Sequence, residues 1–348
     1  MKLRKIALCL LALAMVFISC KNDDDGGSNG VPDRDRAEVY AEDLAEIETF
    51  LETHFYNYED FDFANPYSVA NDDFQIIFKE IDENNLDKTP LMEMVDYKMV
   101  TDPEDEAIVY KLYYLKIREG LGDELYASDE AFLTYEGSIF ANNYVFDSKV
   151  TPIGLNLTQI GTSLSGVVTG FKEGLIEFNA AESFTDNGDG TISYHNHGIG
   201  AIFVPSGIGY FSSPIGEVDA YTPLVFKVNL MEAIHTDFDF DNIPSYKEDL
   251  DGDGDVYSDD TDGDTLPNFV DNDDDGDGVL TRDELDYETY MVNITNGETE
   301  PVFAANEYEI SRETTIDSGT GDEILTIETY IVKDTNGNGT PDYLDDTI

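Results

Sequence analysis

The pattern of apolar and polar positions changes several times along the chain. Over residues 35–55, apolar residues recur every three or four positions among acidic ones, which predicts an amphipathic helix. From residue 107 to about residue 235, β-branched and aromatic residues alternate with polar ones, as in "AIVYKLYYLKIREG", and this predicts strands. After Asp237 the composition shifts to Asp and Gly, and strand-like runs return at 287–333 with "DSGTGD" as a hairpin turn. The sequence thus predicts parts with different folds.

One short helix interrupts the strands predicted for residues 107–235. In "GFKEGLIEF", the residues Phe171, Leu175 and Phe178 lie on one helical face. Many antiparallel strands around one short helix form an α+β domain. We therefore predict the α+β class for this part of the chain.

The first twenty residues have the pattern of a targeting segment. Lys2, Arg4 and Lys5 precede an apolar run that is too short to span a bilayer comfortably. The sequence "FISC" resembles a bacterial lipobox, which implies cleavage before Cys20 and lipidation of its thiol. An ordinary secretory signal followed by an incidental cysteine is the alternative. "KNDDDGGSNG" then predicts a flexible tether and resembles the surface-export signal of Bacteroidetes lipoproteins.

The net charge of the chain limits the classes of molecule that we expect it to bind. The chain has 75 acidic and 19 basic residues, a formal net charge of −56, and 41% hydrophobic residues. Nucleic-acid binding needs clustered Lys and Arg. Because the chain is strongly acidic, we do not expect it to bind nucleic acid. The apolar content is sufficient for a core, which argues against global disorder. Carboxylates in such number favour divalent cations.

The Asp-rich segment contains a match to the EF-hand loop. Asp273, Asp275 and Asp277 stand at positions 1, 3 and 5 of a twelve-residue loop. Gly278 is at position 6, where the backbone turns sharply, and Glu284 is at position 12, the usual bidentate ligand. Calcium needs six to eight oxygens, which short acidic side chains at alternate positions of a tight turn supply.

Further segments repeat this pattern. Asp249, Asp251, Asp253 and Asp260 form a second loop of the same kind. Two more segments resemble thrombospondin type 3 repeats, with the candidate ligands Asp260, Asp262, Asp264, Asn268 and Asp271 in one and Asp334, Asn336, Asn338, Asp342 and Asp345 in the other. Because Asp260 belongs to two patterns, we expect a continuous calcium-lined ribbon. We interpret the calcium as structural, since extracellular sites of this type more often stiffen a segment than sense calcium. A disordered acidic linker is the alternative.

Four motifs within residues 107–235 resemble, in their order, the landmarks of FKBP-type peptidyl-prolyl isomerases. They are "TYEGSIFANNYVFDS", "GVVTGFKEGL", "IFVPSGIGY" and "PLVFKVNL". The combination with Asp-rich repeats is similar to FKBP-type lipoproteins of Bacteroidetes. The resemblance implies an antiparallel sheet wrapped around the short helix, with an apolar pocket between them.

The resemblance also implies the residues of that pocket. These are Tyr135, Phe146, Asp147, Val167, Val168, Phe171, Tyr210, Val218 and Phe226. By the same resemblance, the backbone N–H of Val168 donates to the substrate carbonyl, and Asp147 and Tyr135 supply the polar contacts. The chain has no Trp, and Phe171 stands at the pocket floor, where the family usually has Trp. For each aromatic residue taken singly, ordinary core packing is the alternative.

An insertion at residues 179–198 follows the helix and is long enough to cover the pocket. It contains His195 and His197, which we interpret as surface loop residues rather than a metal-binding pair.

We therefore expect a peptidyl-prolyl cis-trans isomerase that acts on X–Pro bonds of exported proteins. We expect a lipid on Cys20 to anchor it to the outer membrane in the cell envelope, and structural Ca²⁺ to stabilise it. No cofactor is expected for catalysis, and the expected partners are proline-containing polypeptide segments. A non-catalytic FKBP-like binding or adhesion module and a calcium-dependent scaffold are the alternatives. The predicted division is a signal peptide at 1–19, a tether at 20–33, a helical or mixed segment at 34–106, the FKBP-like domain at 107–235, calcium-binding repeats at 236–286, a β-rich segment at 287–333 and a terminal repeat at 334–348.

Overall fold

A computed structural model describes residues 32–160 and 166–348. The predicted signal peptide, Cys20 and most of the tether lie outside these residues. Within the described part of the chain, no helix is both long and apolar enough to cross a membrane.

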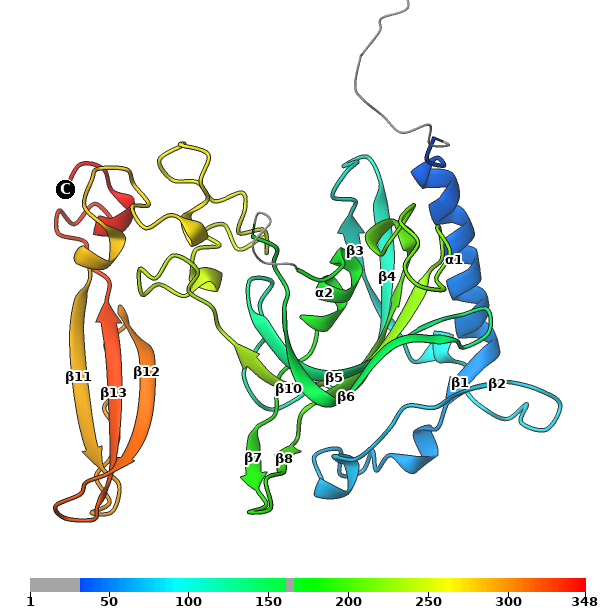
Figure 1. The fold of residues 1–348 in the computed structure, drawn as a ribbon, viewed down its shortest axis with the longest axis horizontal. Coiled ribbons are helices and arrows are strands. Elements are labelled where there is room, and N and C mark those ends of the chain that lie inside the picture. The colour runs from blue at the N-terminus through cyan, green and yellow to red at the C-terminus, as the bar shows by residue number, and fades with distance from the viewer. Residues whose placement is uncertain (1–31, 161–165) are drawn as a thin grey trace, which may run out of the picture. The chain divides into compact units, whose positions relative to one another are not determined.

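A six-stranded antiparallel sheet forms the centre of the fold (Figure 1). Its strand order is β3-β4-β9-β10-β5-β6. The strands are β3 (Asp96–Thr101), β4 (Val109–Arg118), β5 (Glu130–Ile139), β6 (Val145–Asn156), β9 (Gly198–Val204) and β10 (Leu224–Ile234). The predicted boundary at residue 107 falls between β3 and β4, yet these two strands pair along their length. The segment before residue 107 therefore contributes an edge strand to this sheet.

The helix α2 (Thr169–Leu175) packs on one face of the sheet. Two glycines permit the close approach: a Cβ on Gly170 would lie 2.4 Å from Val204 Cγ1, and one on Gly174 would lie 2.3 Å from Ile202 Cγ2. Phe171 and Leu175, which the helical spacing places on one face, are both buried. An α+β class with a sheet around a short helix is thus observed.

The helix α1 (Arg36–Thr53) covers the opposite face of the sheet, at the residues for which the apolar spacing predicts a helix (Figure 1). Its Ile47, Phe50 and Leu51 pack with Leu115 of β4 and Phe203 of β9. Short elements complete this layer: β1 (His54–Tyr56), β2 (Phe78–Glu80) and the 3₁₀ turns Tyr58–Asp60, Val69–Asn71 and Leu91–Glu93. The layer buries an apolar face that the sheet would otherwise expose.

The insertion forms a hairpin of β7 (Ser183–Asp186) and β8 (Ile192–His195). The ring of His195 lies 3.0 Å from an Asp72 carboxylate oxygen, and Tyr194 donates a hydrogen bond to Glu232. His197 is only 2% exposed and lies at the base of the hairpin. The interpretation as a surface residue is therefore wrong for His197, whereas His195 is partly exposed beside Asp72.

The C-terminal part contains Asp-rich loops and a three-stranded sheet of order β11-β13-β12. These strands are β11 (Asp286–Asn293), β12 (Glu307–Ile316) and β13 (Glu323–Ile331). The turn at 317–322 joins β12 to β13, as the sequence predicts. The remaining 3₁₀ turns are Ser206–Ile208, before β10, and Ser245–Lys247, Asn268–Val270, Thr281–Asp283 and Asp342–Leu344 in the Asp-rich loops.

Candidate functional site

Aromatic side chains from α2, β5, β6 and β10, with Tyr210 from the segment before β10, meet beside the start of α2. The ring of Phe226 on β10 lies 4.8 Å from that of Phe171 on α2 and 5.8 Å from that of Phe146 on β6, in both cases edge to face. Tyr210 lies 6.3 Å from Phe146, and Tyr135 lies 6.1 Å from Phe171. Such edge-to-face packing is the favoured geometry of aromatic pairs.

The remaining apolar residues of the predicted pocket lie in the same cluster. Val167 and Val168 precede α2 and are partly buried against it, and Val218 is buried. All the apolar pocket residues that the resemblance implies are thus brought together. Among them, the ring of Phe171 contacts that of Phe226.

The polar rim of the pocket is a short hydrogen-bonded chain. The Tyr135 hydroxyl donates to Asp147 Oδ2 at 2.6 Å, and Lys149 Nζ lies 3.0 Å from Asp147 Oδ1. The hydrogen bond from Tyr135, with that from Lys149, lowers the pKa of Asp147 below its usual value. Asp147 is therefore an exposed carboxylate at the edge of an apolar surface. The sequence reasoning missed Lys149, although it lies two residues further along the same strand.

Gly137 on β5 makes room for the aromatic rings. A Cβ at this position would lie 2.7 Å from Phe146 Cζ and 2.8 Å from Phe226 Cε1. Any side chain here would enter the space between the two rings.

The larger of two cavities, about 820 Å³ against about 540 Å³ for one beside Tyr126 and Tyr246, lies on the other face of the sheet. Its lining includes Asp72, His195, His197, Lys227 and Asn229. On β10, Lys227 and Asn229 alternate with Phe226 and thus point away from the aromatic pocket. The hairpin β7–β8 lines this cavity, so the expectation that the insertion covers the pocket is not met.

The Asp-rich loops bring carboxylates together in groups. The groups Asp249, Asp251 and Asp253, then Asp260, Asp262 and Asp264, and then Asp273, Asp275 and Asp277 each have oxygens within 4.8 Å of one another. In each loop the first Asp accepts backbone hydrogen bonds, as Asp249 does from Gly252 and Gly254. Backbone turns thus fix the carboxylates in place.

One of these loops carries buried carboxylate oxygens without hydrogen-bond partners. In the loop at 273–284 they include Glu284 Oε2 and Asp275 Oδ2. Burial, followed by the charges of Asp275 and other neighbours, raises the pKa of Glu284 to about 7. An all-oxygen set of this kind fits a hard divalent cation such as Ca²⁺.

Two of the predicted metal ligands make hydrogen bonds within their own loops. Asn268 accepts a hydrogen bond from the backbone N–H of Thr261 and donates one to its hydroxyl, and Asp342 accepts hydrogen bonds from the backbone and hydroxyl of Thr335. Both side chains are buried. Their polar atoms hold the loops closed, and their role toward a metal stays a prediction.

The terminal repeat gathers its remaining candidates through amide groups. Asn336 and Asn338 each donate a hydrogen bond to Asp345 Oδ2 at 2.8 Å, and Asp334 accepts the backbone N–H of Gly339. Two neutral amides give this loop a lower negative charge than the others.

The sequence matches the family model described as BamM C-terminal over residues 238–315. This match covers the Asp-rich loops that precede β11, together with β11 and most of β12, and the terminal loop and the aromatic pocket lie outside it. No curated protein matches the sequence at a significant level.

Several solved structures are similar to part of the chain, at low identity and low TM-score. A peptidyl-prolyl cis-trans isomerase from Pseudomonas syringae pv. tomato has 14% identity and a TM-score of 0.31, over 59% of this chain and 99% of that one. FkpA from Escherichia coli has 19% identity and a TM-score of 0.28, over 39% of this chain and 51% of that one. The N-terminal domain of FKBP42 from Arabidopsis thaliana has 15% identity and a TM-score of 0.28, over 40% of this chain and 93% of that one. The likeness concerns fold alone.

Proposed function

We propose that the chain is an FKBP-type peptidyl-prolyl cis-trans isomerase. The observation that carries this proposal is the aromatic pocket, in which Phe146, Phe171 and Phe226 pack edge to face beside the hydrogen-bonded pair Tyr135 and Asp147. A proline ring is apolar and fits between such rings, while the adjoining peptide needs a few polar contacts.

The reaction requires no nucleophile. The barrier to rotation of a peptide bond is about 18–20 kcal/mol because the C–N bond is partly double, and X–Pro bonds populate both isomers. In the twisted transition state this conjugation is lost and the carbonyl is less polar than in the planar amide. An apolar pocket that excludes water favours that state over the solvated planar ones. A barrier lower by about 5 kcal/mol corresponds to a rate gain of several thousandfold.

The polar residues hold the substrate in register. The Val168 N–H, at the start of α2, donates to the substrate carbonyl next to the proline. Asp147, kept ionised by its hydrogen bonds from Tyr135 and Lys149, borders the carbonyl that rotates. Tyr210 and Val218 close the remaining wall.

The proposal extends to location and to the C-terminal loops. Cys20 carries the lipid anchor, and the substrates are proline-containing segments of exported proteins. The match of residues 238–315 to the BamM C-terminal family hints at an association with the outer membrane. The Asp-rich loops hold structural Ca²⁺, which neutralises carboxylates within 4.8 Å of one another.

The experiment is X–Pro exchange in a short peptide, measured by NMR with the full chain in mild detergent. The variant Asp147→Ala removes the rim carboxylate at an exposed position, so the fold is retained. We expect it to lower the exchange rate constant by about tenfold, the effect of about 1.4 kcal/mol in the transition state.

The matched control is Ser148→Ala on the same strand. Ser148 lines the larger cavity on the other face, so its removal leaves the rate unchanged. If neither the wild-type chain nor the control accelerates exchange, the pocket is a non-catalytic binding site on the same fold.

A further inference from the structure

The segment between β10 and the first predicted calcium loop has the backbone of such a loop. Residues 237–248 have Asp at positions 1, 3 and 5 and Glu at position 12. The backbone N–H of Asn242, at position 6, donates to Asp237 Oδ2 at 3.1 Å, as that of Gly254 does to Asp249 Oδ2 at 2.9 Å. Phe240 and Asn242 have φ of 65° and 79°, where the loop at 249–260 has glycines. Because the glycines are missing, the sequence pattern does not reveal this loop.

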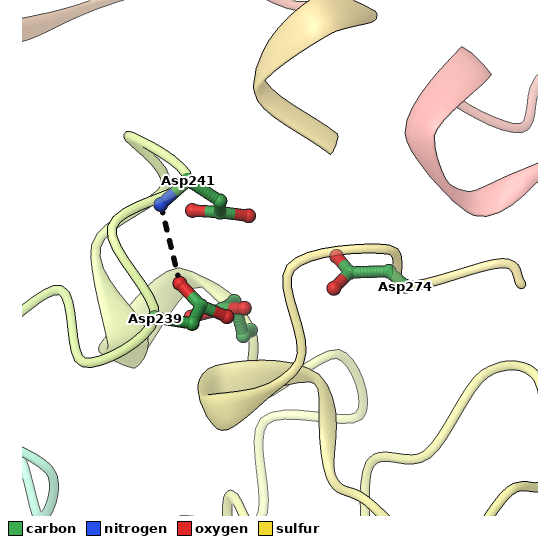
Figure 2. Close-up of side chains that lie close together, drawn as sticks. Asp239, Asp241 and Asp274 are labelled. Carbon is green, nitrogen blue, oxygen red and sulfur yellow. Dashed lines mark hydrogen bonds between the residues drawn. The ribbon is translucent and has the colours of Figure 1, made fainter. Parts of the chain in front are cut away.

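Four carboxylates converge beside this loop. Asp239, Asp241 and Glu248 belong to it, and Asp274 comes from the loop at 273–284. One oxygen of each lies within 4.8 Å of the others. Figure 2 shows the carboxylates of Asp239, Asp241 and Asp274 facing a common space between the two segments. Asp274 occupies position 2 of its own loop and is thus not among the ligands that the EF-hand pattern predicts.

Three of these four side chains are buried, and each of the four has an oxygen without a hydrogen-bond partner among the described residues. Asp241 is 0% exposed, and Glu248 and Asp274 are each 1% exposed. Among the described residues, both carboxylate oxygens of Glu248 and of Asp274 have no hydrogen-bond partner, and the same holds for Oδ2 of Asp239 and of Asp241. Buried carboxylates without partners are strongly destabilising unless a cation compensates them.

We propose that Asp239, Asp241, Glu248 and Asp274 bind a calcium ion that joins the loop following β10 to the loop at 273–284. Four carboxylates offer up to eight oxygens, which meets the six to eight that Ca²⁺ prefers. The absence of His and Cys from this group disfavours zinc and copper, which prefer nitrogen and sulfur ligands. The site is additional to the loops in which calcium is proposed above, and it does not depend on isomerase activity.

The surroundings of the site indicate a structural role. Ile243, from the same loop, packs in a small apolar core with Leu285, Tyr330 of β13 and Tyr343 of the terminal repeat. An ion held by Glu248 and Asp274 therefore connects the segment that leaves β10 to the core of the C-terminal part. Without the ion, mutual repulsion of the carboxylates separates these segments.

The test is the number of calcium ions bound by the full chain, measured by equilibrium dialysis at millimolar calcium. The double variant Glu248→Gln, Asp274→Asn preserves shape and removes two charges. We expect it to bind one ion fewer than the wild type and to have a lower unfolding midpoint in calcium. In chelator we expect the order of the unfolding midpoints to reverse, because the amides need no cation. The variant then unfolds at a higher temperature than the wild type. This reversal also shows that the variant is folded.

Two single variants separate this site from the others. Asp283→Asn changes an exposed side chain of the loop at 273–284 and leaves the ion count unchanged. Glu284→Gln, at position 12 of that loop, removes an ion of its own. An unchanged count in the double variant, with Glu284→Gln still losing an ion, overturns this inference alone. An unchanged count in both overturns calcium binding at the loop at 273–284 as well.

Discussion

At the scale of single residues, the pocket depends on a position without a side chain. Gly137→Ala would place a methyl group 2.7 Å from Phe146 Cζ and 2.8 Å from Phe226 Cε1. Because inserted methyl groups in packed sites force rings off their rotamers, we expect a loss of about 1–3 kcal/mol in the free energy of unfolding. Urea denaturation measures this, and isomerisation falls with it.

Gly319→Ala is the control for this change, because a Cβ there meets only the exposed side chain of Asp317. Equal stability of the two variants would show that the rings are less tightly packed than the distances indicate.

A buried histidine predicts the response to acid. Burial, followed by the charge of Arg118, lowers the pKa of His197 to about 4. The unfolded chain binds this proton near pH 6.5 and the folded chain does not, so stability present above that pH is lost as pH falls from 6.5 toward 4. At pH 5 the loss is about 2 kcal/mol.

The variant His197→Gln lacks this titration. Its free energy of unfolding, relative to that of the wild type, is thus expected to improve by about 2 kcal/mol between pH 7.5 and pH 5. A difference that stays constant over this range would mean that His197 is protonated in the folded state.

At the scale of elements, a buried carboxylate joins α1 to the 3₁₀ turn Ser206–Ile208 that follows β9. Asp43 accepts hydrogen bonds from the backbone N–H of Ser206 at 2.7 Å and from its hydroxyl at 2.6 Å. We expect Asp43→Ala to cost about 1–3 kcal/mol in thermal or urea unfolding, since a buried N–H loses its acceptor. Glu52→Ala, exposed on the same helix, is the control. Equal effects of the two variants would contradict the role assigned to Asp43.

The sequence predicted some elements because their signals are local. The spacing of Val39, Ile47 and Leu51 predicts α1, and that of Phe171 and Leu175 predicts α2, since a helical face is set by neighbours in the chain. The residues of the aromatic pocket came from a resemblance, which carries long-range information that periodicity does not contain. Their roles in catalysis stay predictions.

Other features depend on contacts that local patterns do not encode. The pairing of β3 with β4 and the burial of His197 follow from how distant segments pack. Likewise, Phe240 and Asn242 adopt positive φ at positions where the loop at 249–260 has glycine, so the sequence pattern does not reveal the loop at 237–248. The burial of Asp274 depends on a segment more than thirty residues earlier in the chain, Asp239 being one of its neighbours.

At the scale of the whole molecule, calcium is expected to set the stability of the C-terminal part. A site with free calcium at about 100 times its dissociation constant contributes about 2.7 kcal/mol. In chelator we expect faster hydrogen exchange at amides that donate to loop carboxylates, such as those of Gly254, Thr265 and Gly339. Amides of β4 and β9 provide the internal control. Unchanged exchange throughout the loops would argue against bound calcium.

The central claim is that the aromatic pocket, and not the larger cavity, isomerises X–Pro bonds. Tyr135 and Glu136 are neighbours on β5 and face opposite sides of the sheet, so Tyr135→Phe and Glu136→Gln form a matched pair. The measurement is NMR exchange of an X–Pro peptide with the wild type and both variants. The account predicts acceleration by the wild type, a rate constant about tenfold lower for Tyr135→Phe, and no change for Glu136→Gln. No acceleration by the folded wild-type chain, or a loss confined to Glu136→Gln, would contradict it.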